Sequence, residues 1–241
     1  MTAADMLRVV VASCLPFGDA ASASIWVIGH DPRLRRSAAE AGTCFFLDRL
    51  AQPPGGSRAE RRKRDLAQAV WDYIQRLAGA PIPLSDLYVT NLCNHFLNPP
   101  PGSGTVLIPD DLAEQGLLAI RTALGTRRGP PLLILSMSQQ VLWHMVRTSF
   151  VEDHPALREF STRSRPQPGK AAIGRYAPEK QRGFVDVCGK RFKAQGVPIV
   201  PILHIKSIDK YETSYSEALR TAQFNIRAII NQHKQPDGNQ E

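Results

Sequence analysis

Short apolar runs alternate with longer, partly polar segments along most of the chain. Four of these runs predict buried strands, at residues 24–29, 87–91, 132–136 and 197–204. Helices are expected in five other segments, most of which carry apolar residues at spacings of three and four: 43–50, 60–79, 110–125, 214–232 and one that starts near Ser138. Because strands and helices alternate, we expect an α/β fold of three layers (α/β/α) with a central four-stranded parallel sheet.

Length and composition are those of one large domain. The chain has 241 residues, of which 43% are hydrophobic, so residues 1–235 can form a single domain with a substantial core. Residues 151–196 are rich in Arg, Pro and Gly and lack a sustained period. We expect a basic, loop-rich excursion there, with one helix over residues 183–195. Residues 236–241 are expected to form a disordered tail.

The apolar runs are too short for a membrane span, so no membrane partner is expected. The first apolar run follows Asp5 instead of a positive segment, which favours mature protein over a signal peptide. The cysteines are few and far apart, which predicts free, mostly buried thiols in a reducing cytoplasmic compartment and no metal site. They are Cys14, Cys44, Cys93 and Cys188.

Positive charge is concentrated in two places. The net charge is +8, and residues 158–193 alone hold ten Lys and Arg against three Asp and Glu. A second cluster is Arg58, Arg61, Arg62, Lys63 and Arg64. Such local charge attracts polyanions, nucleic acid first, although a solvated face without a partner has the same appearance in sequence.

Polar residues suited to one task follow three of the four predicted strands. Asp31 follows the first strand, Asn91 ends the second, and His204 ends the fourth. In a parallel sheet ligands bind at the carboxyl ends of the strands. We therefore expect a carboxylate, an amide and an imidazole to converge in one crevice.

The same positions carry a family resemblance. Gly-His-Asp-Pro at 29–32 looks like the Gly-x-Asp-Pro motif of uracil-DNA glycosylases, and Gly-Thr-Cys-Phe-Phe at 42–46 resembles their Gly-x-Cys-Phe segment, although it lies about one residue further on. Leu-Tyr-Val-Thr-Asn at 87–91 resembles the strand that carries the base-reading Asn. The segment 201–207 takes the place of the His-Pro-Ser motif. The ordered set spans roughly residues 22–210 and identifies the chain as similar to a divergent member of that superfamily.

The resemblance implies a role for each matching residue. Asp31 and His204 would be catalytic: the carboxylate would orient water and stabilise the sugar cation, and the imidazole would donate a hydrogen bond to the departing base. Phe45, with Phe46 as the alternative, would stack on the extruded base. Asn91 would pair with the base edge, because an amide has both a donor and an acceptor.

Each of these residues also has a purely structural interpretation. Asp31 can cap a turn, and the two phenylalanines can belong to the core. Asn91 can bond its own backbone. His204 can be a satisfied structural histidine.

Other neighbouring residues complete the expected site. Gly29, His30 and Pro32 are expected to line the substrate, with His30 able to replace a missing catalytic group or to face solvent. The residues expected to bind nucleic acid are Arg33, Lys206, Ser207, Arg163, Arg165 and Lys170. Gln139 and Gln140, after the third strand, could contact phosphates, but we expect them to cap the following helix.

The sequence departs from the family pattern in two places. Ile205 and Lys206 stand between His204 and Ser207, and Arg33 replaces the usual aromatic residue. Ile208 could act as a wedge in the duplex.

These expectations define two main hypotheses. The first is a DNA glycosylase that flips uracil or another deaminated base and hydrolyses its N-glycosidic bond without metal or cofactor. The alternative is a non-catalytic relative that binds nucleic acid or a free nucleotide or base. A third, weaker hypothesis is a nucleoside hydrolase-like or transferase activity, which neither a Gly-rich phosphate loop nor paired metal-binding carboxylates support.

Overall fold

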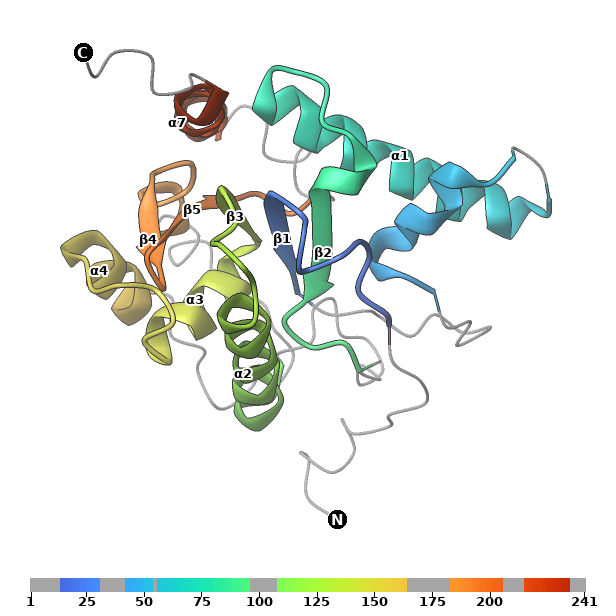
Figure 1. Ribbon diagram of the computed structural model, residues 1–241. Coiled ribbons are helices and arrows are strands. Elements are labelled where there is room, and N and C mark those ends of the chain that lie inside the picture. The colour runs from blue at the N-terminus through green and yellow to red at the C-terminus, as the bar shows by residue number, and fades with distance from the viewer. Residues whose placement is uncertain are drawn as a thin grey trace.

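The computed structural model describes most of the chain, and Figure 1 shows how its elements are arranged. The described residues are 14–30, 42–53, 56–95, 108–163, 183–205 and 215–234. The tail predicted at 236–241 lies outside them.

Five strands form one mixed sheet in the order β2-β1-β3-β5-β4. The strands are β1 (Ile25–Gly29), β2 (Leu87–Asn91), β3 (Leu133–Met137), β4 (Phe192–Ala194) and β5 (Val197–Ile202). All neighbours are parallel except β4, which pairs antiparallel with β5 at the edge. The predicted α/β class and the four parallel strands are confirmed, but the sheet has a fifth strand.

Helices lie on both sides of the sheet in Figure 1. They are α1 (Arg58–Ala78), α2 (Asp110–Gly125), α3 (Gln139–Arg147), α4 (Pro155–Arg163) and α7 (Ser216–Lys234), with 3-10 turns η2 (Cys44–Ala51) and η3 (Leu84–Asp86). Helices α1 and α7 pack together on one side, whereas α2, α3 and α4 lie on the other. The carboxyl ends of the parallel strands therefore open toward the N-termini of α1, α2 and α3.

Local sequence explains where the helices begin and end. Ser57 caps α1 by accepting a hydrogen bond from the Glu60 N–H at 3.3 Å, and Gly79 ends it in the left-handed conformation at φ 70°. Ser138 caps α3 in the same way through the Val141 N–H. The prediction that Gln139 or Gln140 caps this helix is wrong, because the shorter serine hydroxyl reaches the backbone instead.

The basic excursion differs most from its prediction. Of the helix expected over 183–195, only residues 183–185 are helical, because residues 192–194 form β4 and turn back through Gln195 and Gly196 into β5. Gly196 has φ 78°, which suits the tight turn of a hairpin. Helix α4 is absent from the sequence predictions. It is short, and only Leu157 and Phe160 of its nine residues are buried, so its period is weak in sequence.

The core lies on both faces of the sheet, and strands β1 and β3 are buried along their whole length. All four cysteines are free and buried, as predicted. No helix in the described ranges is long and apolar enough to cross a membrane. Among the same residues, no group of three or more His, Cys, Asp or Glu side chains is placed to hold a metal ion.

Close packing of α2 against the end of β2 yields a first prediction. A Cβ on Gly116 would lie 1.7 Å from the carbonyl oxygen of Leu92, whereas one on Gly125 of the same helix would have nothing within 4 Å. We expect Gly116→Ala to lower the free energy of unfolding by about 1–3 kcal/mol through overpacking. Gly125→Ala should change it by less than about 1 kcal/mol. Urea unfolding of both variants measures the difference, and equal midpoints would contradict the close approach.

Candidate functional site

Buried polar side chains concentrate near the carboxyl ends of the strands. Within the described ranges six polar residues are buried: His30, Thr90, Asn91, Ser136, Gln140 and His144. The first four stand at or near the ends of β1, β2 and β3, and the last two belong to α3, which follows β3. Since burying polar groups costs free energy, their gathering at one edge marks that edge as the candidate site.

Two of the four central residues of the predicted set, Asn91 and Phe45, meet at Gly29, and a third, His204, lies near Phe45. The register pairs Gly29 with Asn91 across β1 and β2. A Cβ on Gly29 would lie 2.3 Å from Oδ1 of Asn91 and 3.0 Å from Cε2 and Cζ of Phe45. The ring centroid of Phe45 is 6.3 Å from that of His204, with the two ring planes at 51°. The Phe45 ring therefore lies near both the position of the Asn91 amide and the His204 imidazole.

Two asparagines stand at the end of β2, and they have different roles. The side chain of Asn94 is used within the fold: its Oδ1 accepts from the backbone N–H of Asn91 at 3.2 Å, and its Nδ2 donates to Thr90 Oγ1 at 3.2 Å. Asn91 is 5% exposed, and no hydrogen bond of its side-chain amide is found among the described residues. Asn94 thus shapes the end of β2, whereas the side chain of Asn91 lies against Gly29.

Phe45 and Phe46 have an unusual backbone. Their φ angles are 55° and 56°, in the left-handed region that phenylalanine rarely adopts. Each such residue costs of order 1–3 kcal/mol, and surrounding contacts must hold it there. Both rings are partly exposed, so each keeps surface that a ligand can cover. The helix predicted at 43–50 is a 3-10 turn interrupted at these two residues.

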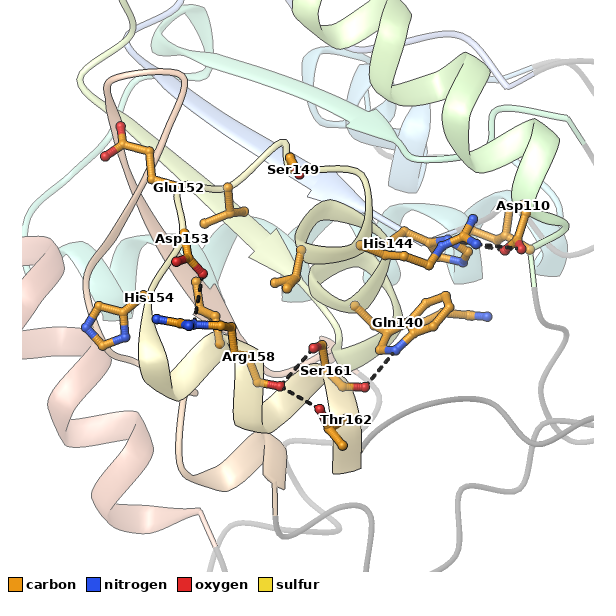
Figure 2. A pocket seen from close by; sticks show the side chains of 16 residues that line it. Asp110, Gln140, His144, Ser149, Glu152, Asp153, His154, Arg158, Ser161 and Thr162 are labelled. Atoms are coloured by element: carbon orange, nitrogen blue, oxygen red, sulfur yellow. Dashed lines mark hydrogen bonds and ion pairs between the residues drawn. The ribbon is translucent and has the colours of Figure 1, made fainter.

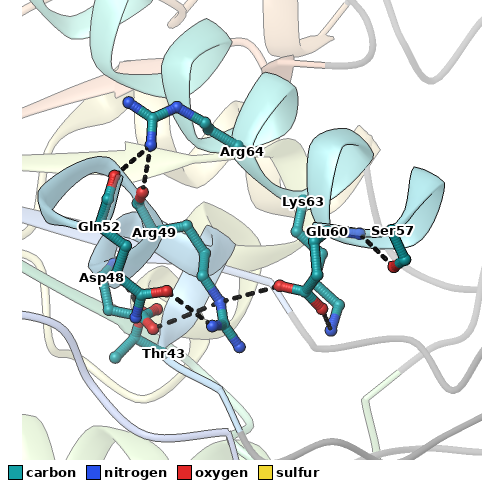
Figure 3. A network of polar contacts seen from close by, with 8 residues as sticks. All are labelled: Thr43, Asp48, Arg49, Gln52, Ser57, Glu60, Lys63 and Arg64. Carbon is teal, nitrogen blue, oxygen red and sulfur yellow. Dashed lines mark hydrogen bonds and ion pairs between the residues drawn. The ribbon is translucent and has the colours of Figure 1, made fainter. Parts of the chain in front are cut away.

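A polar network holds this strained turn against α1, as Figure 3 shows. The Thr43 hydroxyl bonds the Asp48 carboxylate and accepts from the Asp48 N–H at 3.3 Å. Arg49 lies 3.6 Å from the carboxylates of both Asp48 and Glu60. Arg64 of α1 donates to the carbonyl oxygens of Arg49 and Gln52. Such a connected network can stabilise the left-handed pair.

Two thiols anchor the same turn on its buried side. The Sγ atoms of Cys14 and Cys44 are 3.4 Å apart, and the Cys44 thiol lies 3.6 Å from Oδ1 of Asn94. The hydrogen bond with Cys14 and burial together raise the pKa of Cys44 well above its ordinary value. Cys44 is therefore a neutral thiol that ties the residue before Phe45 to the end of β2.

Two polar residues of α3, the helix that follows β3, are also buried, and the sequence analysis assigned one of them, His144, no place in the site. Gln140 and His144 are four residues apart and so share one face of α3, a signal that the surrounding apolar stripe obscured. His144 is 1% exposed, and neither ring nitrogen has a hydrogen-bond partner in the described structure. Burial lowers the pKa of His144 to about 3, and electrostatic interactions with Arg147 and His30 add to the effect. The electrostatic influence of His30 indicates that His144 lies close to the end of β1.

A cavity of about 950 Å³ opens beside these α3 residues, as Figure 2 shows. It is lined by α3, α4 and the loop between them, with Gln140 and His144 among its walls. Its charged groups are mostly paired: Arg158 lies 3.1 Å from Asp153, and Arg147 lies 2.9 Å from Asp110. Asn91, Phe45 and His204 do not line it, so this cavity is adjacent to the candidate site and separate from it.

Several predicted site residues lie outside the described residues. These are Asp31, Pro32, Arg33, Arg165, Lys170, Lys206, Ser207 and Ile208. Arg163 is described: its guanidinium forms ion pairs with Glu159 and, at 3.5 Å, with Asp186. A phosphate at Arg163 would have to compete with these two carboxylates.

Comparison with known proteins adds no assignment. No family model matches the sequence, and a search of curated proteins found none that is similar to it.

The buried state of His144 leads to a second prediction, on the pH dependence of stability. The native pKa of about 3 lies below the ordinary value of about 6.5, so the unfolded chain binds a proton that the native protein does not. His144 therefore favours folding above pH 6.5, and this contribution is lost as the pH falls toward 3, by up to about 1.4 kcal/mol per pH unit.

Urea unfolding between pH 7 and pH 4 tests this against His144→Gln, which cannot titrate. The free energy of unfolding of the original protein should fall more steeply with pH than that of the variant. His233→Gln, a change at an exposed position of α7, should leave the slope unaltered. Parallel curves for the original protein and His144→Gln would contradict the prediction.

Proposed function

We propose that this protein is a DNA glycosylase that flips uracil or another deaminated base and hydrolyses its N-glycosidic bond. The observation that carries the proposal is that Asn91 and Phe45 meet at Gly29 on the carboxyl edge of the sheet, with the ring centroid of His204 6.3 Å from that of Phe45. This trio has the chemistry that recognition of a flipped base requires: an edge reader, a stacking ring and a hydrogen-bond donor.

In this proposal, each of the three described residues has its own role in binding the flipped base. The amide of Asn91 pairs with the adjacent N–H and C=O of the base, and the half-buried ring of Phe45 covers the base face. The imidazole of His204 donates to the base oxygen that gains negative charge as the bond breaks. The resemblance to uracil-DNA glycosylases supplies the remaining part: the carboxylate of Asp31 stabilises the sugar cation and orients the attacking water.

An excision assay tests the proposal. Oligonucleotides that contain uracil, hypoxanthine or xanthine are incubated with the protein and then cleaved with alkali at abasic sites. We expect strand breaks on at least one lesion. His204→Ala should slow excision by about 10²–10³-fold because a transition-state donor is removed, and Asp31→Asn by about 10²–10⁴-fold.

Matched controls separate chemistry from folding in this assay. Phe224 and His233 are exposed on α7, so Phe224→Ala and His233→Ala should retain full excision, whereas Phe45→Ala and His204→Ala should not. An absence of strand breaks on all three lesions, with a folded protein, would overturn the proposal.

The close approach at Gly29 provides a separate prediction. In Gly29→Ala the new methyl group collides with Oδ1 of Asn91 and touches Phe45, so both groups must move from their positions. We expect excision to fall at least tenfold, because misplacement of about 1 Å is costly in catalysis. Gly129→Ala, where a Cβ has nothing within 4 Å, is the matched control. Full excision by Gly29→Ala would show that this contact does not position the site.

A non-catalytic protein that binds nucleic acid is the second candidate. Residues 58–64 hold five Lys and Arg, and this charge attracts nucleic acid whether or not a base is excised. Salt-dependent DNA binding without excision, retained in Asp31→Asn, would support this function over the first.

A further inference from the structure

A basic face occupies the first two turns of α1. Arg58, Arg61 and Arg62 are all exposed, and their spacings of three and four place them on one side of the helix. Residues 58–65 hold five Lys and Arg against two acids, Glu60 and Asp65. This end of α1 follows η2 and lies at the carboxyl edge of the sheet.

Helix stability does not account for this cluster. Backbone N–H groups at a helix N-terminus carry partial positive charge, so cations in the first turn are unfavourable there. Arg58 and Arg61 add formal positive charge at that position, and Arg62 follows within the next turn. Arg61 also donates a hydrogen bond to the Gly56 carbonyl oxygen at 2.8 Å, which leaves its positive charge in place. The charges of the cluster are thus unfavourable for the helix, whereas an anionic partner would be attracted by all of them at once.

The basic face is connected to the candidate site through η2. The Lys63 ammonium lies 5.6 Å from the ring centroid of Phe46 and 2.8 Å from the Glu60 carboxylate. Phe46 follows Phe45, whose ring adjoins Gly29. The network in Figure 3 fixes η2 to α1, so the basic face keeps its position relative to the aromatic pair.

The other described cations of the basic regions are less available. On α4, Arg158 pairs with Asp153 at 3.1 Å, and Arg163 pairs with Glu159 and Asp186. On α1, Glu60 engages Arg49 and Lys63, which are partly buried, rather than the exposed arginines. The exposed face of α1 therefore has the more open positive charge.

We propose that Arg58, Arg61 and Arg62 bind the phosphate backbone of the DNA strand whose base enters the candidate site. This inference rests on the proposed function for the identity of the ligand. Arg58 and Arg62 are one helical turn apart, about 6 Å along the axis between their backbone positions, so that their guanidinium groups can contact successive phosphates. These contacts are independent of sequence and sensitive to salt.

Fluorescence anisotropy with a labelled single-stranded, uracil-containing oligonucleotide tests the proposal across a series of salt concentrations. Arg58→Ala/Arg62→Ala should weaken binding by roughly tenfold to a hundredfold at 50 mM salt. It should also reduce the slope of log affinity against log salt by about 1.4, or about 0.7 for each phosphate that the variant no longer neutralises. The control is Arg76→Ala/Arg128→Ala, which removes two exposed cations at the opposite edge of the sheet and should leave the slope unchanged.

Folding of the variant is checked by urea unfolding, where the midpoint should be equal or higher because cations leave the positive end of α1. An unchanged slope, an equal weakening in the control, or no salt-dependent binding by the original protein would overturn the inference. Excision on the same oligonucleotide is measured in parallel. If the original protein binds the oligonucleotide but does not excise its base, the glycosylase proposal is refuted. If the α1 variant then still binds more weakly than the original protein, the proposed DNA-binding face is supported on its own.

Discussion

The candidate site depends on the close approach of three segments at Gly29. Strand β1 runs between β2 and β3, and its parallel register with β2 brings Gly29 opposite Asn91. Because Gly29 has no side chain, the Asn91 amide and the Phe45 ring can both lie against its backbone. Any side chain at this position would push the amide and the ring apart. The relation between the Asn91 amide and the Phe45 ring is therefore set by a contact with backbone.

The polar contacts around η2 stabilise its strained backbone. Phe45 and Phe46 adopt a backbone that phenylalanine disfavours, and the thiol of Cys44 and the carboxylate of Asp48 hold the turn on either side. The same turn is tied to α1 through Arg64. A rigid aromatic pair next to a basic helix face has the features expected of a surface that orders a nucleic-acid strand and one of its bases.

Much of the fold was predictable because it is encoded in local patterns. The limits of β2 and α2 agree with their predictions, since each has a clear period and clear terminal signals. The failure over 183–195 has a physical reason. A three-residue edge strand gains its hydrogen bonds from β5, and nothing in its own sequence outweighs the helical spacing of Val185 and Cys188.

The sequence by itself determined which polar residues end the strands, because strand period and parallel connections depend on neighbours along the chain. Asn91 and His204 could thus be assigned to one edge of the sheet from the order of the strands alone. Only the tertiary structure decided that Phe45 reaches Gly29 and that the side chain of Asn94 bonds Asn91 and Thr90 at the end of β2. It likewise decided that Gln140 and His144 are buried beside the site. These features arise from contacts between residues far apart in the chain, whose side-chain directions no local period specifies.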